Sequence, residues 1–219
     1  MKYPRTYHLP FSPGKSNDDK VMHDISCLLN KPLVITEKMD GSNVSLSLDN
    51  CFARSHSGPP NHPSFDQLKS IHASIKYIIP KNVSLYGEWL YAKHSICYDS
   101  LPAYLMIFAA RYADDKESAW YMWPTVERIA EDLGLLTVPV IKKNKYFVSE
   151  NELETYILEE AKKPSLYGAE REGLVIRTDG GFVDEQFQTC IAKYVRKNHV
   201  QTDEHWKHKQ IEKNGLKLI

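Results

Sequence analysis

The sequence predicts a mixed α+β fold, and three observations support that prediction. An apolar run in Leu33–Lys38 and an alternating one in Asn43–Leu48 are typical of strands. In Phe65–Ile79 the apolar residues recur at helical spacing instead. Strand and helix patterns are interspersed along the 219 residues without a repeat, a low-complexity tract or a linker, so we expect residues 1–219 to form a single domain.

The first half of the chain is expected to hold a short helix, three strands and a longer helix. The short helix covers Lys20–Leu29 and is ended by Asn30-Lys31-Pro32. Three strands joined by tight turns follow: Leu33–Lys38, Asn43–Leu48 and Cys51–Arg54. The first turn carries Asp40-Gly41, a strong hairpin signal, and the second carries Asp49-Asn50. Gly58–Pro63 is rich in proline and is expected to be a loop before the helix of Phe65–Ile79.

The second half alternates strands and helices. Two segments are apolar enough to be central strands: Val83–Leu90 and Tyr104–Tyr112. Pro124 suits the first turn of a helix that runs to about Leu133 and is stopped by Gly134. Ser149 is a plausible N-cap for a further helix, which continues to about Lys163. The last two strands are expected at Gly173–Thr178 and Thr189–Val195.

Composition neither supports nor opposes a nucleic-acid partner. The chain has 28 Lys and Arg and 28 Asp and Glu, so its net charge carries no nucleic-acid signature. The four cysteines are scattered, which predicts reduced thiols and not zinc ligands or disulfides. The N-terminus has no apolar signal region, and no run approaches the roughly 18 apolar residues of a membrane span. We therefore expect a protein of the cytoplasm or nucleus that is neither secreted nor bound to a membrane.

Several short segments place chemically capable residues at strand ends. Lys38 is followed closely by Asp40-Gly41, and Glu88, Glu172 and Lys193 occur in later strand-like segments. Each has a structural alternative when taken singly. Lys38 can be an exposed lysine before a hairpin turn, the glutamates can be edge-strand carboxylates, and Phe108 can be a core residue. The occurrence of all of them in one order favours a catalytic site.

That ordered set resembles the covalent nucleotidyltransferases, the superfamily of polynucleotide ligases and mRNA capping enzymes. The extended match around Lys38 is most similar to RNA ligases of the group typified by RNA ligase 2. The segments that carry the resemblance are Lys38-Met39-Asp40-Gly41-Ser42-Asn43, Arg54-Ser55-His56-Ser57-Gly58, Tyr86-Gly87-Glu88, Leu105-Met106-Ile107-Phe108, Glu172-Gly173 and Lys193. They look like motifs I, III, IIIa, IV and V of the superfamily and the arginine segment that follows motif I.

The resemblance implies a fold, an activity and a set of site residues. The fold is the nucleotidyltransferase fold, an ATP-grasp-like ligase fold of two antiparallel sheets with flanking helices and a central nucleotide cleft. The activity is that of an ATP-dependent RNA ligase, which takes AMP from ATP onto Lys38, passes it to an RNA 5′-phosphate and joins that end to a 3′-hydroxyl. Glu172 would bind Mg²⁺ or Mn²⁺. The nucleotide-binding residues would be Glu37, Asp40, Gly41, Asn43, Arg54, Glu88, Phe108, Lys193 and Lys197.

Elementary chemistry explains why such residues are needed. A lysine has a pKa near ~10.4, so we expect burial or nearby positive charge to lower the pKa of Lys38 and free its lone pair. Lys193 and Arg54 would stabilise negative charge on the phosphoryl oxygens. Glu88 can accept a hydrogen bond from a ribose hydroxyl, and Phe108 offers a flat apolar face to a purine.

The sequence departs from the superfamily at two places. Motif V often has a second lysine two residues after the first, and here that residue is Val195. Strand alternation favours Lys197 over Arg196 as its substitute. Only 22 residues follow Lys197, too few for the C-terminal OB-fold of DNA ligases and capping enzymes, so we expect none. A separate protein partner could supply the RNA clamp.

Alternatives remain open at this point. One is a DNA nick or end ligase of the same superfamily, and another is a non-catalytic module that binds nucleotides or RNA ends. The C-terminal tail, from Lys193 to Lys217, could contact RNA phosphates, and its affinity for RNA would then fall steeply as the salt concentration rises. Alternatively, the tail could simply pack on the core through Trp206, Ile211 and Leu216. The candidate RNA-contacting residues are Arg196, Lys197, His199, Lys207, Lys209 and Lys213.

Overall fold

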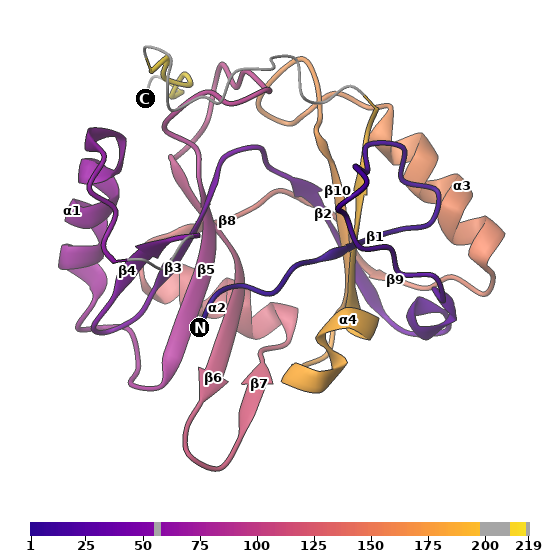
Figure 1. Ribbon diagram of the computed structural model, residues 1–219, viewed down its shortest axis with the longest axis horizontal. Helices are drawn as coiled ribbons and strands as arrows, with labels where there is room; N and C mark the ends of the chain where they lie inside the picture. The colour runs from indigo at the N-terminus through magenta and orange to yellow at the C-terminus, as the bar shows by residue number, and fades with distance from the viewer. Residues whose placement is uncertain (55–57, 198–210, 218–219) are drawn as a thin grey trace.

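Two sheets stand beside each other, with helix α1 (Asp66–Ile75) on the outer side of one and helix α3 (Glu150–Ala161) on the outer side of the other (Figure 1). The computed structural model describes residues 1–54, 58–197 and 211–217, and every structural statement concerns these residues. The five-stranded sheet has the order β1-β12-β10-β2-β9. Its strands are β1 Tyr7–His8, β12 Ile191–Val195, β10 Gly173–Thr178, β2 Leu33–Lys38 and β9 Val140–Lys145. All neighbours in it pair antiparallel except β1 and β12.

The seven-stranded sheet has the order β11-β7-β6-β5-β3-β4, and β8 pairs with β6 in parallel. Its strands are β11 Phe182–Val183, β7 Ser118–Trp120, β6 Leu105–Ala113, β5 Val83–Trp89, β3 Ser42–Leu46, β4 Cys51–Ala53 and β8 Leu136–Thr137. Strands β5 and β6 lie in its middle, as their apolar sequences predict. These two sheets with flanking helices confirm the predicted fold class.

Each sheet buries its own group of apolar side chains under helices. The helices are α1 Asp66–Ile75, α2 Trp123–Asp132, α3 Glu150–Ala161 and α4 Phe187–Cys190, and 3₁₀ turns lie at Ser26–Leu28, Pro63–Phe65 and Asp184–Gln186. Helix α3 packs Leu153 and Ile157 against the five-stranded sheet, while Leu68 of α1 and Val126 of α2 cover the seven-stranded sheet. The predicted cap is confirmed, because the Ser149 hydroxyl accepts a hydrogen bond from the Glu152 amide at 3.2 Å. Gly134, after α2, has a φ of +66°, a conformation that favours glycine.

Two predictions of local structure are wrong. The segment Lys20–Leu29 is not a helix, since only the 3₁₀ turn Ser26–Leu28 forms there and Met22 instead pairs its amide with the His8 carbonyl. Asp40-Gly41 is not a hairpin turn, because β2 and β3 belong to different sheets. The chain crosses between the sheets at Gly41, where a Cβ would come within 2.6 Å of the Trp89 carbonyl oxygen. Glycine is thus required at position 41 because another part of the backbone approaches closely there, and not because the chain makes a turn.

Candidate active site

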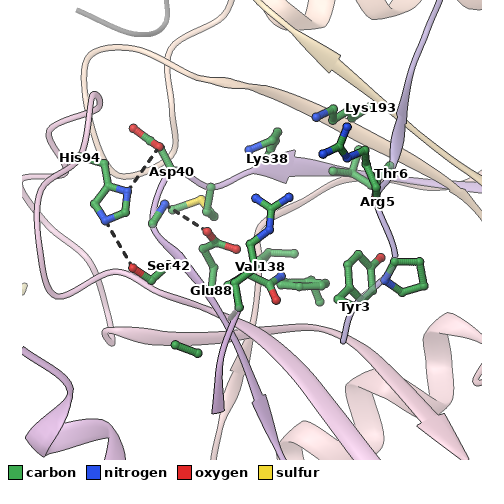
Figure 2. Close-up of a pocket in the computed structure, with 18 of the residues that line it drawn as sticks. Tyr3, Arg5, Thr6, Lys38, Asp40, Ser42, Glu88, His94, Val138 and Lys193 are labelled. Carbon is green, nitrogen blue, oxygen red and sulfur yellow. Dashed lines mark hydrogen bonds and ion pairs between the residues drawn. The ribbon is translucent and has the colours of Figure 1, made fainter. Parts of the chain in front are cut away.

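A cavity of about 760 Å³ lies between the two sheets, a size that suits a small-molecule ligand (Figure 2). The five-stranded sheet contributes Lys38 from β2 and Lys193 from β12, and the seven-stranded sheet contributes Glu88 from β5 and Phe108 from β6. The predicted site residues that line it are Glu37, Lys38, Asp40, Gly41, Asn43, Arg54, Glu88, Phe108 and Lys193. Glu172 and Lys197 are not among the described residues that line it.

Glu172 lies against the Lys38 ammonium group. Lys38 pairs with Gly173 across β2 and β10, and this register brings the preceding residue, Glu172, beside the lysine. Lys38 Nζ lies 2.7 Å from Oε1 and 2.6 Å from Oε2 of Glu172. Gly173 is constrained to be small, since a Cβ there would lie 2.0 Å from the Tyr194 carbonyl oxygen. The predicted nucleophile and the predicted metal ligand are therefore direct partners.

The carboxylates around Lys38 hold its proton in place. Burial lowers the pKa of Lys38, but Glu172, Glu88 and Asp40 raise it, and the net result is a pKa above the ordinary lysine value. The expectation of a lowered Lys38 pKa is thus wrong for the ligand-free site. Burial likewise raises the pKa of Glu172 to about 7, against the opposing effect of Lys38. Bound positive charge, or the loss of the Glu172 contact, is needed before the amine is a nucleophile.

Glu88 faces the cavity from the opposite sheet. One of its carboxyl oxygens, Oε1, accepts a hydrogen bond from the Gly41 amide at 3.2 Å. Burial raises the pKa of Glu88 to about 8, with Lys38 acting against the shift. Asn43 pairs with Glu88 across β3 and β5, so both residues reach the same end of the cavity.

Asp40 organises a loop next to the cavity. Its Oδ2 accepts hydrogen bonds from the amides of Ser95 and Ile96, both at 2.8 Å. The Asp40 amide donates to the Tyr98 hydroxyl at 2.8 Å. His94, from the same loop, lines the cavity and lies 3.4 Å from the Ser42 hydroxyl through Nε2 (Figure 2). The Asp40 carboxylate thus holds protein backbone at the edge of the cavity that Asp40 also lines.

The C-terminal segment supports this same loop. Asn214 is buried, accepts a hydrogen bond from the Tyr98 amide at 3.0 Å and donates to the Leu90 carbonyl at 2.8 Å. Gly215 donates to the Tyr98 carbonyl at 2.8 Å. Lys213 lies over the Tyr91 ring, 5.0 Å from its centroid. Of the tail residues proposed to bind RNA, His199, Lys207 and Lys209 lie outside the described residues, as does Trp206 of the packing alternative.

Lys193 and Arg54 bring positive charge to the cavity. Burial, together with the nearby Lys38 ammonium group, lowers the pKa of Lys193. The Lys193 ammonium group lies 3.8 Å from Asp19 Oδ1, so its charge is partly balanced. Arg54 is exposed and lines the same cavity. Asp19 could not be predicted from local sequence, since its pairing with Lys193 depends on β1 lying beside β12.

Phe108 lies where the pairing of β5 with β6 is irregular. Gly87 pairs with Ile107 and Tyr86 with Ala109, so Phe108 is left between the two pairs. Such an extra residue turns a side chain out of the regular alternation. The Phe108 ring packs edge-on against Tyr3 at a centroid distance of 5.0 Å and also lines the cavity. It is therefore both a packed residue and a wall of the site.

Two predicted ligand-binding residues have other surroundings. The Glu37 side chain is buried, where its Oε2 accepts from the Leu166 amide at 3.2 Å and lies 3.5 Å from Arg171 Nε. The neighbouring residue Lys38 bonds to Glu172 instead, so two adjacent residues of β2 contact different parts of the protein. Lys197 is exposed in a turn after β12 ends at Val195, so the alternation argument that placed it beside Lys193 fails. Arg196, the other candidate, bonds to Glu170.

A divalent cation at this site would be held by Glu172 together with oxygens of the ligand and water. Among the described residues, no group of three or more His, Cys, Asp or Glu side chains is arranged to hold a metal. Mg²⁺ is commonly held by one or two carboxylates, with phosphates and water completing the shell. Glu172 can serve in that way because each oxygen has two lone pairs, one of which remains when Lys38 is bound.

Solved structures of RNA and DNA ligases match this chain in fold, which supports the nucleotidyltransferase fold. A mutant RNA ligase from Naegleria gruberi, solved with ATP and Mn, matches with 15% identity and a TM-score of 0.55 over 90% of this chain and 60% of that one. An archaeal ATP-dependent RNA ligase matches with 15% identity and a TM-score of 0.55 over 89% and 48%. A putative ATP-dependent DNA ligase from Aquifex aeolicus matches with 16% identity and a TM-score of 0.53 over 89% and 50%. The chain spans 48% to 60% of the length of these three proteins.

The family model for RNA ligases matches residues 31–195, which is most of the chain. The chain therefore belongs to the RNA ligase family, and the resemblance in its motifs is confirmed. No curated protein sequence matches it. Within the described part of the chain, every helix is too short or too polar to cross a membrane.

Proposed function

We propose that the chain is the adenylyltransferase domain of an ATP-dependent RNA ligase that works through a lysyl-AMP intermediate. One observation carries the proposal: Lys38 of motif I lies in a cavity between the two sheets, held by Glu172 of motif IV and flanked by Glu88 and Lys193. Family membership and the ATP-bound neighbour support ATP as the AMP donor.

In the first step the Lys38 amine attacks the α-phosphorus of ATP. A phosphorus–nitrogen bond forms, the bond between the α-phosphorus and the bridging oxygen breaks, and pyrophosphate leaves with that oxygen. The Lys38 ammonium group releases one proton before it attacks and a second as the bond forms, and both pass to water, so the product is a phosphoramidate with one negative charge on its phosphoryl oxygens. The adenylate then passes to an RNA 5′-phosphate, and a 3′-hydroxyl displaces AMP to form the phosphodiester.

The residues around Lys38 divide the remaining tasks. Lys193 and Arg54 place positive charge where the phosphoryl oxygens gain negative charge. Glu88 binds a ribose hydroxyl, and Phe108 supplies an apolar face for the base. Glu172 holds Lys38 and is the residue that would hold a divalent cation. A bound Mg²⁺ or Mn²⁺ would add charge stabilisation at the phosphates.

DNA sealing is the second candidate. The putative DNA ligase from Aquifex aeolicus matches the fold nearly as well as the RNA ligases do, with a TM-score of 0.53 against 0.55. We favour RNA with a 5′-phosphate and a 3′-hydroxyl because the matching family model is that of RNA ligases. A partner protein that clamps the RNA remains part of the proposal.

The test is covalent labelling. The full chain is incubated with ATP labelled at the α-phosphate and with Mg²⁺ or Mn²⁺, then denatured and examined for retained label. We expect retained label in the wild-type protein and none in Lys38→Ala or Lys38→Arg, since arginine stays protonated. Absence of label in the wild type would refute the ligase proposal, and label retained in Lys38→Ala would place the nucleophile elsewhere. Matched RNA and DNA nicks then separate the two substrates.

A further inference from the structure

The N-terminal segment forms a wall of the cavity that the motifs do not include. Tyr3, Pro4, Arg5 and Thr6 all line the cavity, although none belongs to a motif of the superfamily found in the sequence. The segment crosses from the seven-stranded sheet to β1 at the edge of the five-stranded sheet (Figure 1). The segment therefore lies across the space between the two sheets, where the ligand would bind.

Both ends of this segment are fixed. The Tyr3 ring packs against four aromatic rings at centroid distances of 5.0 to 5.3 Å, those of Tyr86, Phe108, Trp120 and Phe187. On the other side, Tyr7 pairs with Ala192 and His8 with Lys193. Arg5 lies between these two anchors, so its backbone has a defined place at the cavity.

Arg5 carries a charge that no described carboxylate balances. Arg5 Nη1 donates a hydrogen bond to the Asp18 carbonyl oxygen at 2.8 Å, and within residues 1–54, 58–197 and 211–217 Arg5 forms no ion pair. Lys38 and Lys193, by contrast, have the carboxylates of Glu172 and Asp19. Figure 2 shows Arg5 in the same corner of the cavity as Lys193. A guanidinium group with free donors in such a place suits a phosphate dianion, which it can bind through two parallel hydrogen bonds.

We propose that Arg5 is a phosphate-binding residue of this site, where the N-terminal segment completes the cleft. The inference rests on the proposed function and specifies one of its binding contacts. The shared chemistry is a phosphate group, and it can come from two sources: the pyrophosphate part of ATP or the 5′-phosphate of the RNA.

The experiment compares Arg5→Gln and Arg5→Lys with Lys2→Gln, an exposed cation of the same segment that does not line the cavity. One arm measures covalent adenylation over a range of ATP concentrations and its inhibition by inorganic pyrophosphate. The other arm starts from adenylated protein and measures AMP transfer to 5′-phosphorylated RNA. Loss of a charged hydrogen bond predicts an increase of about tenfold in the half-saturating concentration for Arg5→Gln in one arm. Arg5→Lys should be affected less, and Lys2→Gln should equal the wild type.

The arm that changes identifies the source of the phosphate. A change with ATP and pyrophosphate assigns Arg5 to the leaving group, and a change only with RNA assigns it to the 5′-phosphate. Wild-type values for Arg5→Gln in both arms would overturn the proposal, as would equal impairment in Lys2→Gln.

A second measurement covers the case in which Arg5→Gln fails to fold. Phenylglyoxal modification of Arg5 in the wild-type protein, located by peptide mass spectrometry, should slow several-fold with inorganic pyrophosphate or 5′-phosphorylated RNA, but not with chloride at the same ionic strength. An unchanged modification rate with both phosphates would refute the contact. This measurement requires no turnover, so it is independent of whether the protein forms lysyl-AMP.

Discussion

The two sheets that enclose the cavity contribute different kinds of groups. The five-stranded sheet carries the cations Lys38 and Lys193, with Glu172 at the start of β10. The seven-stranded sheet carries Asn43, Glu88 and Phe108, which offer hydrogen-bonding groups and an apolar ring. On the proposed function, the first sheet performs the phosphoryl chemistry and the second recognises the nucleoside. Substitutions in the five-stranded sheet should therefore slow covalent adenylation. Substitutions in the seven-stranded sheet should weaken the binding of ATP.

The largest effect is expected on the five-stranded sheet. Glu172→Ala and Lys193→Ala should each slow covalent adenylation by roughly 10²-fold or more, because each removes a preorganised electrostatic contact. The Glu172→Ala defect should change with metal concentration, and the Lys193→Ala defect should change much less. Single-turnover labelling at saturating ATP measures both.

Lys145→Ala is a suitable control, since Lys145 lies on the same sheet in β9 and is not among the residues that line the cavity. Normal adenylation in both site variants, with only RNA sealing impaired, would contradict the division of tasks between the sheets.

The C-terminal segment should matter for both stability and adenylation. A chain ending at residue 210 loses Asn214 and leaves the Tyr98 amide and the Leu90 carbonyl without their partner. Each unpaired buried group costs about 1–3 kcal/mol. Because the Tyr98 hydroxyl accepts from the Asp40 amide, the loss extends to the nucleophile's segment. We therefore expect the truncated chain to be less stable and to adenylate more slowly than the full chain.

Asn214→Ala tests the same point with a smaller change. Its melting temperature should fall by several degrees and its adenylation should slow, while exposed Lys213→Ala should leave the adenylation rate near that of the wild type. Adenylation at the wild-type rate by the truncated chain would show that the C-terminal segment contributes packing and does not support the nucleophile's segment.

Acid should destabilise the edge of the five-stranded sheet through His8. Burial, helped by the nearby Lys193 charge, lowers the pKa of His8 to about 4, while Asp19 acts in the opposite direction. An unfolded histidine has a pKa near ~6.5, so between pH 6.5 and 4 the unfolded chain binds the extra proton. Stability should thus fall as the pH falls through this window, by roughly 2 kcal/mol between pH 7 and 4.5.

Urea denaturation at the two pH values measures this loss. His8→Asn keeps a polar group near Ser12, whose hydroxyl lies 2.8 Å from His8 Nδ1, but has no proton to gain. The variant should lose less stability on acidification than the wild type. Equal losses in the two proteins would mean that His8 does not govern this dependence.

The smallest effect is expected from the base-binding ring of the seven-stranded sheet. Phe108→Ala should weaken ATP binding about tenfold, in line with about 1–3 kcal/mol for stacking on an aromatic ring, and Phe108→Tyr should weaken it less. Equilibrium binding of a non-hydrolysable ATP analogue measures the change. Phe187→Leu is the control, because Phe187 packs on Tyr3 as Phe108 does but is not among the described residues that line the cavity. A Phe187→Leu defect equal to that of Phe108→Ala would indicate lost packing and not lost stacking.

Local sequence was sufficient for the central strands, for three of the helices and for nine of the residues that line the cavity. Strands β2 and β10 have the predicted bounds because both are apolar runs buried in the middle of a sheet. The motif order brought Lys38, Glu88, Phe108 and Lys193 to one cavity. Helix α3 begins after Ser149 because the cap is itself a local interaction.

The failures all involve partners distant in sequence. Asp40-Gly41 has the composition of a turn, but contacts with Trp89 and Tyr98 make it a crossing between sheets. The segment Lys20–Leu29 forms bridges to β1 instead of a helix. Asp19 and Arg5 could not be found because nothing in their own segments indicates that β1 lies beside β12. Tertiary contacts override local propensity at these positions.

The crossing at Asp40 also offers a way to observe the cleft without any reaction. The amides of Ser95 and Ile96 both donate to one oxygen of Asp40, which joins the loop of one sheet to the nucleophile's strand in the other. Their hydrogen exchange with solvent therefore requires the two sheets to separate locally at this junction. Both amides should have the same protection factor, which reports how often the ligand-free cleft opens.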